Sequence, residues 1–259
     1  MSTTNDFSDL VSVIMPAYNA QEYIFESIQS VLNQSSVNIE LIIIDDASTD
    51  DTVSIVKKNY SNDLRVRLLA NSKNLGPGIA RNKGLICAKG RFIAFLDSDD
   101  IWVEEKLQKQ IKFMLKKGIG MSYTQFRRFR ELGNDVGRLI DIPIKLSYYE
   151  LLKNTAIATS TVMIDKNVVG DIPIINVSKN YLEDYIIFYS ILKKGFCAFG
   201  LKEDLMRYRV VKGSFSRNKY NYAMKVWKTY RKIENLNILS SFYYFCHYAI
   251  RGLVKYSKF

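Results

Sequence analysis

The chain has 259 residues, of which 47% are hydrophobic and 24% charged, values typical of one compact domain or of one domain with an appendage. Thirty-seven Lys and Arg against 26 Asp and Glu give a net charge of +11, which favours an anionic partner. The single histidine, His247, excludes zinc sites that need two or three imidazoles and disfavours a Ser/His/Asp triad.

The positive charge is concentrated towards the C-terminus. Residues 201–259 hold 13 Lys and Arg against three acidic residues, so residues 1–200 are close to neutral. The three cysteines lie far apart without CxxC spacing, which predicts reduced thiols in a cytosolic protein. The polar, acidic start does not resemble a signal peptide, and the longest apolar run (242–250) is far shorter than the roughly 20 residues of a spanning helix. We therefore expect no membrane span.

Segments of strand length alternate with helix-period segments through the first half of the chain. Apolar runs predict strands at 11–15, 40–46, 65–70, 91–97 and 118–126. Helices are predicted between them at 21–33, from near Ser48 or Asp50, from near 76–78, and at 102–117. Continuous apolar strands separated by helices are typical of a mostly parallel sheet with helices on both faces. This pattern predicts an α/β, Rossmann-like fold with ligands at the carboxyl ends of the strands.

The second half of the chain is less regular. Residues 127–146 are polar and contain two glycines, which indicates a hairpin or a mobile loop. The other predicted elements are a short helix (147–153), a strand (157–164), an amphipathic helix (181–194), strands at 196–200 and 205–210, and two basic, aromatic helices near 218–234 and 240–256.

Three carboxylates lie within the four residues Asp97-Ser98-Asp99-Asp100, directly after an apolar strand. A divalent cation removes their mutual repulsion, and Mg²⁺ or Mn²⁺ prefers oxygen ligands and usually also binds substrate phosphates. The alternative is that Asp99 or Asp100 caps the helix that follows. The residues alone leave both interpretations open.

Asp45 and Asp46 close another apolar strand and are followed by Ser48-Thr49-Asp50-Asp51. Carboxylates at this edge could accept hydrogen bonds from a base N–H or from ribose hydroxyls. The alternative, an N-cap with acidic residues in the first helical turn, explains residues 48–51 better than it explains the two aspartates.

Gly76-Pro77-Gly78 opens a predicted helix that carries Arg81 about one turn later. Glycines at this point let the backbone approach a ligand closely, and Arg81 could reach a phosphate or a carboxylate. The alternative is an ordinary turn followed by an exposed arginine. Neither a GxGxxG fingerprint nor a P-loop occurs in the chain.

Glu183 and Asp184 open the amphipathic helix predicted at 181–194. Because the chain has one histidine, a carboxylate is the best candidate for a general base, and this pair is well placed for that role. The alternative is that both residues only stabilise the N-terminus of the helix.

Taken together, these motifs resemble glycosyltransferase family 2, a family of inverting, nucleotide-sugar-dependent enzymes with the GT-A fold. The matching segments, in the family's order, are VSVIMPAYNA, LIIIDDASTDDT, NLGPGIARNKGL, FIAFLDSDD, LEDYIIFYSILKKG and YRVVKGSFSRNK. The resemblance implies a GT-A catalytic domain at 1–217, with nucleotide-sugar binding in about 11–100 and acceptor binding in 101–217. A basic, aromatic helical extension at 218–259 would follow.

The resemblance also implies roles for individual residues. Tyr18 would lie against the uracil, and Asp97-Ser98-Asp99 looks like the family's DXD motif, in which Asp99 would bind the metal through the diphosphate. Asp184 looks like the catalytic base, with Glu183 as its neighbour. The residues implied for the nucleotide sugar are Pro16, Ala17, Tyr18, Asn19, Asp45, Asp46, Gly76, Arg81, Asp97 and Ser98, and those implied for Mn²⁺ or Mg²⁺ are Asp99 and Asp97.

One position departs from the family's pattern. Many members carry a histidine after the Tyr-Arg-Val of the late motif, sometimes as a further metal ligand. Here Tyr208-Arg209-Val210 is followed by Val211. The resemblance therefore implies no protein ligand to the metal beyond the DXD aspartates.

The C-terminal fifth interleaves aromatic residues with Lys and Arg, as interfacial helices do at a lipid surface. The alternatives are nucleic-acid binding and simple packing of two helices on the catalytic domain. A membrane surface is favoured because members of this family often extend a sugar on a polyprenyl diphosphate, which is itself anionic and lipid-embedded. No nucleic-acid partner is expected beyond the donor nucleotide.

These inferences predict a metal-dependent, inverting hexosyltransferase that moves glucose or galactose from a UDP-sugar to a polyprenyl-diphosphate-linked saccharide. It would act in the cytoplasm, peripherally on the inner face of the cytoplasmic membrane, in O-antigen or capsule synthesis. A nucleotidyltransferase acting on sugar phosphates is one alternative, although PAYNAQEY lacks the glycine-rich, basic loop expected of it. A non-catalytic basic protein that binds membrane or RNA is the other.

Overall fold

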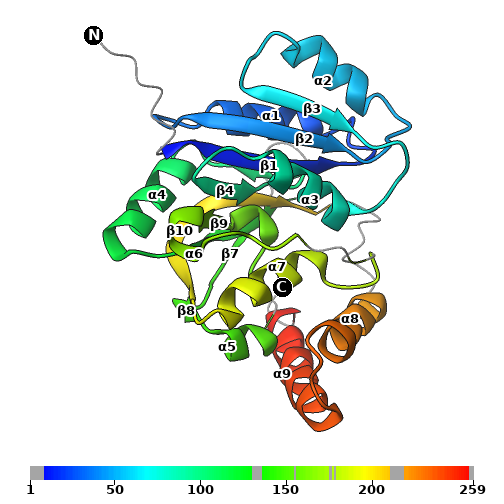
Figure 1. Ribbon diagram of the computed structural model, residues 1–259, viewed down its shortest axis with the longest axis vertical. Helices are drawn as coiled ribbons and strands as arrows, with labels where there is room; N and C mark the ends of the chain where they lie inside the picture. The colour runs from blue at the N-terminus through cyan, green and yellow to red at the C-terminus, as the bar shows by residue number, and fades with distance from the viewer. Residues whose placement is uncertain are drawn as a thin grey trace.

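The computed structural model describes residues 9–129, 136–154, 156–174, 177, 179–210 and 219–256, and a mixed sheet forms its centre (Figure 1). The main strand order is β3-β2-β1-β4-β9-β6-β10-β5, with β7 beside β6 and β8 beside β10. The strands are β1 (Val11–Ala17), β2 (Ile39–Asp45), β3 (Val66–Ala70), β4 (Phe92–Phe95), β5 (Ile101–Trp102), β6 (Met121–Phe129), β7 (Val136–Ile140), β8 (Lys145–Leu146), β9 (Met163–Asp165) and β10 (Ala198–Arg209).

Helices cover both faces of this sheet. They are α1 (Ile24–Leu32), α2 (Thr52–Tyr60), α3 (Pro77–Cys87), α4 (Lys106–Lys117), α5 (Tyr148–Leu152), α6 (Lys166–Val169), α7 (Glu183–Lys193), α8 (Lys219–Lys228) and α9 (Ile238–Tyr256), with a 3₁₀ turn η2 (Thr159–Thr161) and a π-helical turn η4 (Thr229–Ile233). The side chains of β1 alternate between two cores: Val13 and Met15 pack with α1 and α4, and Ile14 packs with α3 and α7. This explains why the strand is apolar at consecutive positions.

The first half of the sheet has the predicted parallel arrangement. Strands β3, β2, β1 and β4 are parallel neighbours, so their carboxyl ends meet at one edge. The second half is mixed, because β9 runs antiparallel to both β4 and β6, while β6 and β10 are parallel. The predicted α/β fold with a mostly parallel sheet and a helical C-terminal region is confirmed.

Four predicted elements were wrong in their bounds. Ile101 and Trp102 do not begin a helix; they form β5, which pairs antiparallel with β10, and α4 begins at Lys106. The strands predicted at 196–200 and 205–210 are one strand, β10, whose charged middle is accommodated by two irregularities in its pairing with β6. In the segment 157–164, a 3₁₀ turn precedes a strand that covers only Met163–Asp165.

The polar segment 127–146 forms the predicted hairpin. β6 continues to Phe129 and pairs antiparallel with β7, which begins at Val136. Residues 130–135, which connect these two strands in the sequence, lie outside the described residues.

The C-terminal helices are attached to the main core through α8 and the π-turn η4. Figure 1 shows α8 and α9 together at the end of the molecule away from α2. Val226 and Tyr230 are almost fully buried in the same core as α7. The backbone N–H of Leu182 donates to Thr229 Oγ1 over 3.0 Å, at a buried position just before α7. Within the part of the chain that the structure describes, no helix is both long and apolar enough to cross a membrane.

Replacing Thr229 by Val should lower the free energy of unfolding by about 1–3 kcal/mol, because the buried N–H of Leu182 loses its acceptor. Urea denaturation measures this change. Thr229→Ser is the matched control, since it keeps the hydroxyl group. Equal stability of the Val and Ser variants would show that this hydrogen bond does not hold the start of α7.

Candidate active site

The loops that follow β1 and β2 are bound to each other at the carboxyl edge of the sheet. The N–H of Asn19 donates to Ser48 Oγ over 2.9 Å, and the N–H of Thr49 donates to Asn19 Oδ1 over 2.9 Å. Asn19 and Ala47 both adopt left-handed backbone conformations, with φ of 47° and 62°. Pro16 and Ala17 lie in buried β1, whereas Tyr18 is 49% exposed at its end. An exposed aromatic side chain therefore follows Ala17, which pairs with Asp45 at the end of β2.

Asp45 and Asp46 are both buried but differ in their hydrogen bonds. Asp46 accepts from Asn71 Nδ2 at 2.8 Å and from the backbone N–H groups of Leu75 and Gly76, so its oxygens hold the loop before α3. Asp45 Oδ2 accepts from the N–H of Ser48, while Asp45 Oδ1 is buried without a partner among the described residues. A buried acceptor without a partner is costly, and a ligand N–H would satisfy it.

The entrance of α3 lies directly against the start of α7. Gly76 has φ of +94°, and Pro77 is the first residue of α3. A Cβ on Gly78 would lie 2.6 Å from Glu183 Cβ, so the glycine permits the two helices to approach. Two motifs separated by about a hundred residues of sequence therefore meet at one place.

Replacing Gly78 by Ala should reduce the free energy of unfolding by about 1–3 kcal/mol and also reduce activity, because α7 must move away from α3. Urea denaturation and a transfer assay measure the two effects. Ile86→Ala, at an exposed position of the same helix, is the control. If Gly78→Ala behaves like the control, the close approach is not needed.

Arg81 lies at the centre of a group of carboxylates. It is 5% exposed, and its Nη2 donates to Asp97 Oδ1 over 2.6 Å. Burial lowers the pKa of Arg81, but the charges of Asp97, Asp184 and Glu183 more than offset this, and its pKa is raised. The alternative of an exposed arginine after a turn is therefore wrong. The Nε of Arg81 is buried without a partner among the described residues.

The segment Asp97-Ser98-Asp99-Asp100 brings three carboxylates close together, so their negative charges repel one another. Burial and the charge of Asp97 raise the pKa of Asp99 to about 6, and burial together with Asp99 raises that of Asp100 well above its usual value. Asp100 is held inside by Ser160 Oγ, which donates to it over 2.6 Å, and by the N–H of Arg209. Since α4 begins at Lys106, neither Asp99 nor Asp100 caps it, and that alternative is wrong.

Arg209 fixes this acidic loop from β10. Its Nε donates to the backbone oxygen of Asp99 over 2.8 Å, and its Nη2 donates to Glu26 Oε2 over 2.6 Å. The guanidinium lies between the rings of Tyr23 and Phe129, at 4.6 and 4.5 Å from their centroids. The sequence motif contained Arg209 but gave it no role. Ser98 also contributes to fixing the loop, because its carbonyl accepts from Ser27 Oγ.

Glu183 and Asp184 open α7 beside Arg81, and they differ in exposure. Glu183 is 7% exposed, and burial raises its pKa although Arg81 and Lys225 act against this. Asp184 is only partly buried, and its Oδ2 accepts from Thr159 Oγ1. Of the two carboxylates, Asp184 is the more accessible to solvent. Thr159 and Ser160 lie in the 3₁₀ turn η2. The sequence analysis predicted a strand there and gave neither residue a role in the site.

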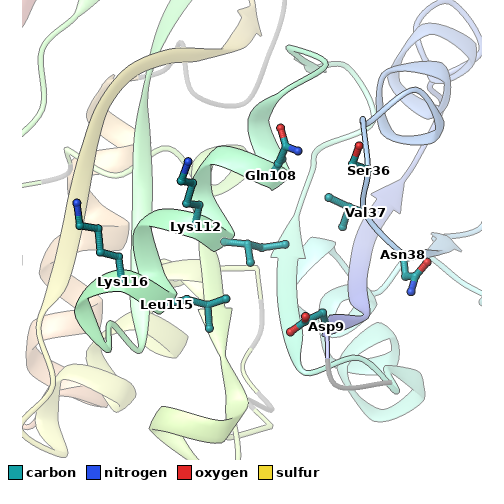
Figure 2. A pocket seen from close by; sticks show the side chains of 9 residues that line it. Asp9, Ser36, Val37, Asn38, Gln108, Lys112, Leu115 and Lys116 are labelled. Atoms are coloured by element: carbon teal, nitrogen blue, oxygen red, sulfur yellow. The ribbon is translucent and has the colours of Figure 1, made fainter. Parts of the chain in front are cut away.

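The structure thus brings the residues predicted for donor, metal and base to one edge of the sheet. Within the described ranges, no group of three or more His, Cys, Asp or Glu is arranged to hold a metal ion. A separate groove lies between α4 and the segment around Asn38 (Figure 2). None of the predicted site residues lines that groove.

Comparisons with known proteins show which sequences and structures this chain is similar to. Residues 12–173 match the model of the family Glycosyl transferase family 2. A Bacillus subtilis glycosyltransferase named for teichuronic acid biosynthesis, TuaG, is 41% identical over 250 residues, which cover 96% of this chain and 98% of the relative. The Escherichia coli enzyme WfgD, named UDP-Glc:alpha-D-GlcNAc-diphosphoundecaprenol beta-1,3-glucosyltransferase, is 38% identical over 249 residues, with 96% and 95% covered.

Solved structures show the same fold. Residues 1–349 of TarS from S. aureus, in complex with UDP-GlcNAc, superpose with a TM-score of 0.69 at 23% identity, covering 86% of this chain and 65% of that chain. The mannosyltransferase PcManGT of Pyrobaculum calidifontis, in complex with GDP-Man and Mn²⁺, gives a TM-score of 0.64 at 18% identity, covering 88% and 64%. This chain therefore spans about two thirds of each solved chain.

Proposed function

The chain belongs to glycosyl transferase family 2, and on that premise we propose that it transfers a hexose from a UDP-sugar to a saccharide on polyprenyl diphosphate, with inversion. The names of WfgD and a second E. coli relative, WfaP, support a UDP-glucose donor and a GlcNAc-diphosphoundecaprenol acceptor. Glucose is accordingly favoured over galactose. The product would enter a surface polysaccharide such as an O-antigen or a capsule. The family assignment leaves no support for a nucleotidyltransferase or a non-catalytic binding protein.

The observation that carries this proposal is the convergence of Arg81, Asp97 and Asp184 at one edge of the sheet. Asp184 is the general base: it takes the proton of the acceptor hydroxyl as that oxygen attacks the anomeric carbon. The bond to the diphosphate breaks in the same step, so the configuration inverts. Thr159 Oγ1 and the N–H of Tyr185 orient Asp184 by donating to its Oδ2 and Oδ1 respectively, and each oxygen keeps a lone pair for the acceptor.

Asp45 is the residue we assign to the base of the nucleotide, because its Oδ1 is a buried acceptor without a partner among the described residues. Tyr18 stacks on that base, and Asp46 acts indirectly by holding the backbone of Gly76 in place. Pro16, Ala17 and Asn19 are assigned to the same nucleotide site, because they lie at the end of β1 and in the loop that follows it. Arg81 and the backbone at Gly76 face the diphosphate, with Asp97 and Ser98 at the ribose side.

Asp99 and Asp97 are the residues that would hold Mn²⁺ or Mg²⁺. Their oxygen donors suit a hard cation, and burial together with the charge of Asp97 raises the pKa of Asp99, as expected where carboxylates lie close together. When bound, the metal neutralises charge on the diphosphate that leaves. Arg209 keeps the two carboxylates in position through the backbone of Asp99.

The acceptor places the enzyme, by inference, at the cytoplasmic face of the membrane as a peripheral protein. Its partners are then the UDP-sugar, the lipid-linked saccharide and an anionic lipid surface. The division into a catalytic domain (1–217) and a membrane-associated extension (218–259) remains part of the proposal. Burial of Val226 and Tyr230 in the main core supports an extension that is fixed to the catalytic domain rather than tethered.

A donor panel tests the function. Purified protein is incubated with UDP-glucose, UDP-galactose, UDP-GlcNAc or GDP-mannose, with Mn²⁺ and a GlcNAc-diphosphate-lipid analogue. We expect transfer from UDP-glucose above the other donors, and loss of transfer when EDTA removes the metal. Transfer that EDTA leaves unchanged would contradict the assigned role of Asp99, and absence of transfer or hydrolysis with every donor would contradict the function.

A further inference from the structure

The outer face of α9 carries a continuous apolar stripe in contact with solvent. Leu239 is 80%, Phe242 62% and Ile250 60% exposed. The residues of the stripe follow helical spacing and line one shallow groove: Leu239, Phe242, Tyr243, Cys246, His247 and Ile250. Single exposed apolar residues are ordinary, but an ordered row of them marks an interaction surface.

The opposite face of α9 already has its partners. Phe245 meets Trp227 edge to face with ring centroids 5.5 Å apart, and Tyr244 meets Tyr230 at 6.4 Å. Tyr248 lies 6.4 Å from Tyr222. One face of α9 therefore packs on the protein, and the apolar stripe on the other face remains exposed. A helix that is apolar on both sides indicates a second apolar environment.

The positive charge near the stripe favours an anionic environment. The chain has no acidic residue after Glu234, and residues 201–259 hold most of its net positive charge. Arg251 is exposed on α9, and Lys153 Nζ lies 5.3 Å from the centroid of Tyr243 at the rim of the stripe. A second copy of this chain would bring the same positive charge against itself. An anionic bilayer offers an apolar interior and a complementary surface.

We propose that α9 lies in the plane of an anionic membrane and inserts this stripe, from Leu239 to Ile250, at the level of the lipid headgroups. The stripe is about 17 Å long at the rise of an α-helix, which suits a helix that lies on a bilayer. This inference deepens the proposed function and rests on it, since a lipid-linked acceptor must be met at a membrane.

The inner contacts of the extension give the docking a direct consequence for catalysis. Thr229, between α8 and α9, accepts the hydrogen bond of Leu182, which directly precedes Glu183 and Asp184. Asp184, the proposed base, is therefore on a helix whose start is hydrogen-bonded to the turn between α8 and α9. Insertion of the stripe fixes the orientation of Asp184 relative to the bilayer that carries the acceptor.

Co-sedimentation with vesicles tests the surface without donor or acceptor. The vesicles contain phosphatidylglycerol and phosphatidylcholine in equal parts, and the double variant Leu239→Glu/Phe242→Glu is compared with the unaltered protein. We expect the variant to bind at least about tenfold more weakly, because both side chains leave an apolar environment and gain negative charge. Leu64→Glu, at a 99% exposed position in the turn before β3, is the matched control and should bind normally.

A second assay separates this inference from the proposed function. Transfer to a short-chain, water-soluble acceptor analogue should be unchanged in the double variant, whereas transfer to acceptor embedded in vesicles should fall with binding. Thermal unfolding confirms that the variant is folded. Vesicle binding equal to that of the unaltered protein would overturn the docking surface, and so would a dimer of the unaltered protein that the double variant dissociates. Failure of every transfer assay with vesicle binding intact would instead overturn the proposed function alone.

Discussion

Replacing Asp184 by Asn is expected to lower kcat for sugar transfer by about 10²- to 10⁴-fold, the range that general-base catalysis contributes. Asn keeps the size of the side chain and can still accept from Thr159 Oγ1, but it cannot take a proton. The residues proposed to contact the nucleotide lie on other elements, so binding of UDP in the presence of Mn²⁺ should be unchanged. Steady-state kinetics with a UDP-sugar, together with calorimetric titration of UDP, measure both quantities.

Asp63→Asn provides the control for this substitution, because Asp63 is a surface carboxylate paired with Arg65 far from the site. It should leave kcat unchanged. If Asp184→Asn kept more than a tenth of the activity, the base would have to be sought elsewhere, and Glu183 would be the next candidate despite its burial.

Replacing Asp99 by Asn is expected to reduce transfer by roughly 10³-fold or more, since a metal ion supplies several kcal/mol of charge stabilisation to a leaving diphosphate. Unlike the change at Asp184, it should also weaken binding of Mn²⁺ in the presence of UDP. Electron paramagnetic resonance of free Mn²⁺ measures that binding directly. The substitution removes a negative charge that is poorly compensated, so the metal-free protein should be at least as stable as before.

Asp141→Asn is the control here, because Asp141 is an exposed carboxylate that pairs with Lys202. It should change neither Mn²⁺ binding nor transfer. Normal Mn²⁺ binding by Asp99→Asn would contradict the assignment of Asp99 as a metal ligand. The two variants thus separate the roles: one loses the base and keeps the metal, while the other loses the metal.

Much of the fold could be predicted because its strongest signals are local. Strands such as β1 are apolar at successive positions since Ile14 and Met15 face different cores, and this pattern needs no knowledge of distant residues. The extent of β10 could not be predicted in this way. The charged residues in its middle predict a break between two strands. In the structure, pairing with β6 continues across them and makes one strand.

The same distinction applies to the site. Residues at or near the carboxyl end of a parallel strand, such as Asp45 and Asp97, are brought to one edge of the sheet by its topology, so their location could be predicted from the strand pattern alone. The burial of Arg81 could not be read from its sequence, because it depends on α7 approaching at Gly78. Thr159 likewise reaches Asp184 across 25 residues of sequence from an irregular turn. Sequence periodicity predicts single helices and strands. The contacts of Arg81 and Thr159 depend instead on how different elements pack against one another.

The central claim, a single displacement that uses Asp184 as base, is tested most directly by the configuration of the product. The protein is incubated with UDP-glucose, whose glucose is α-linked, Mn²⁺ and the GlcNAc-diphosphate-lipid analogue, and the purified product is examined by proton nuclear magnetic resonance. The coupling constant of the new anomeric proton distinguishes the two configurations. The account predicts a β-linked glucose; an α-linked product would contradict it.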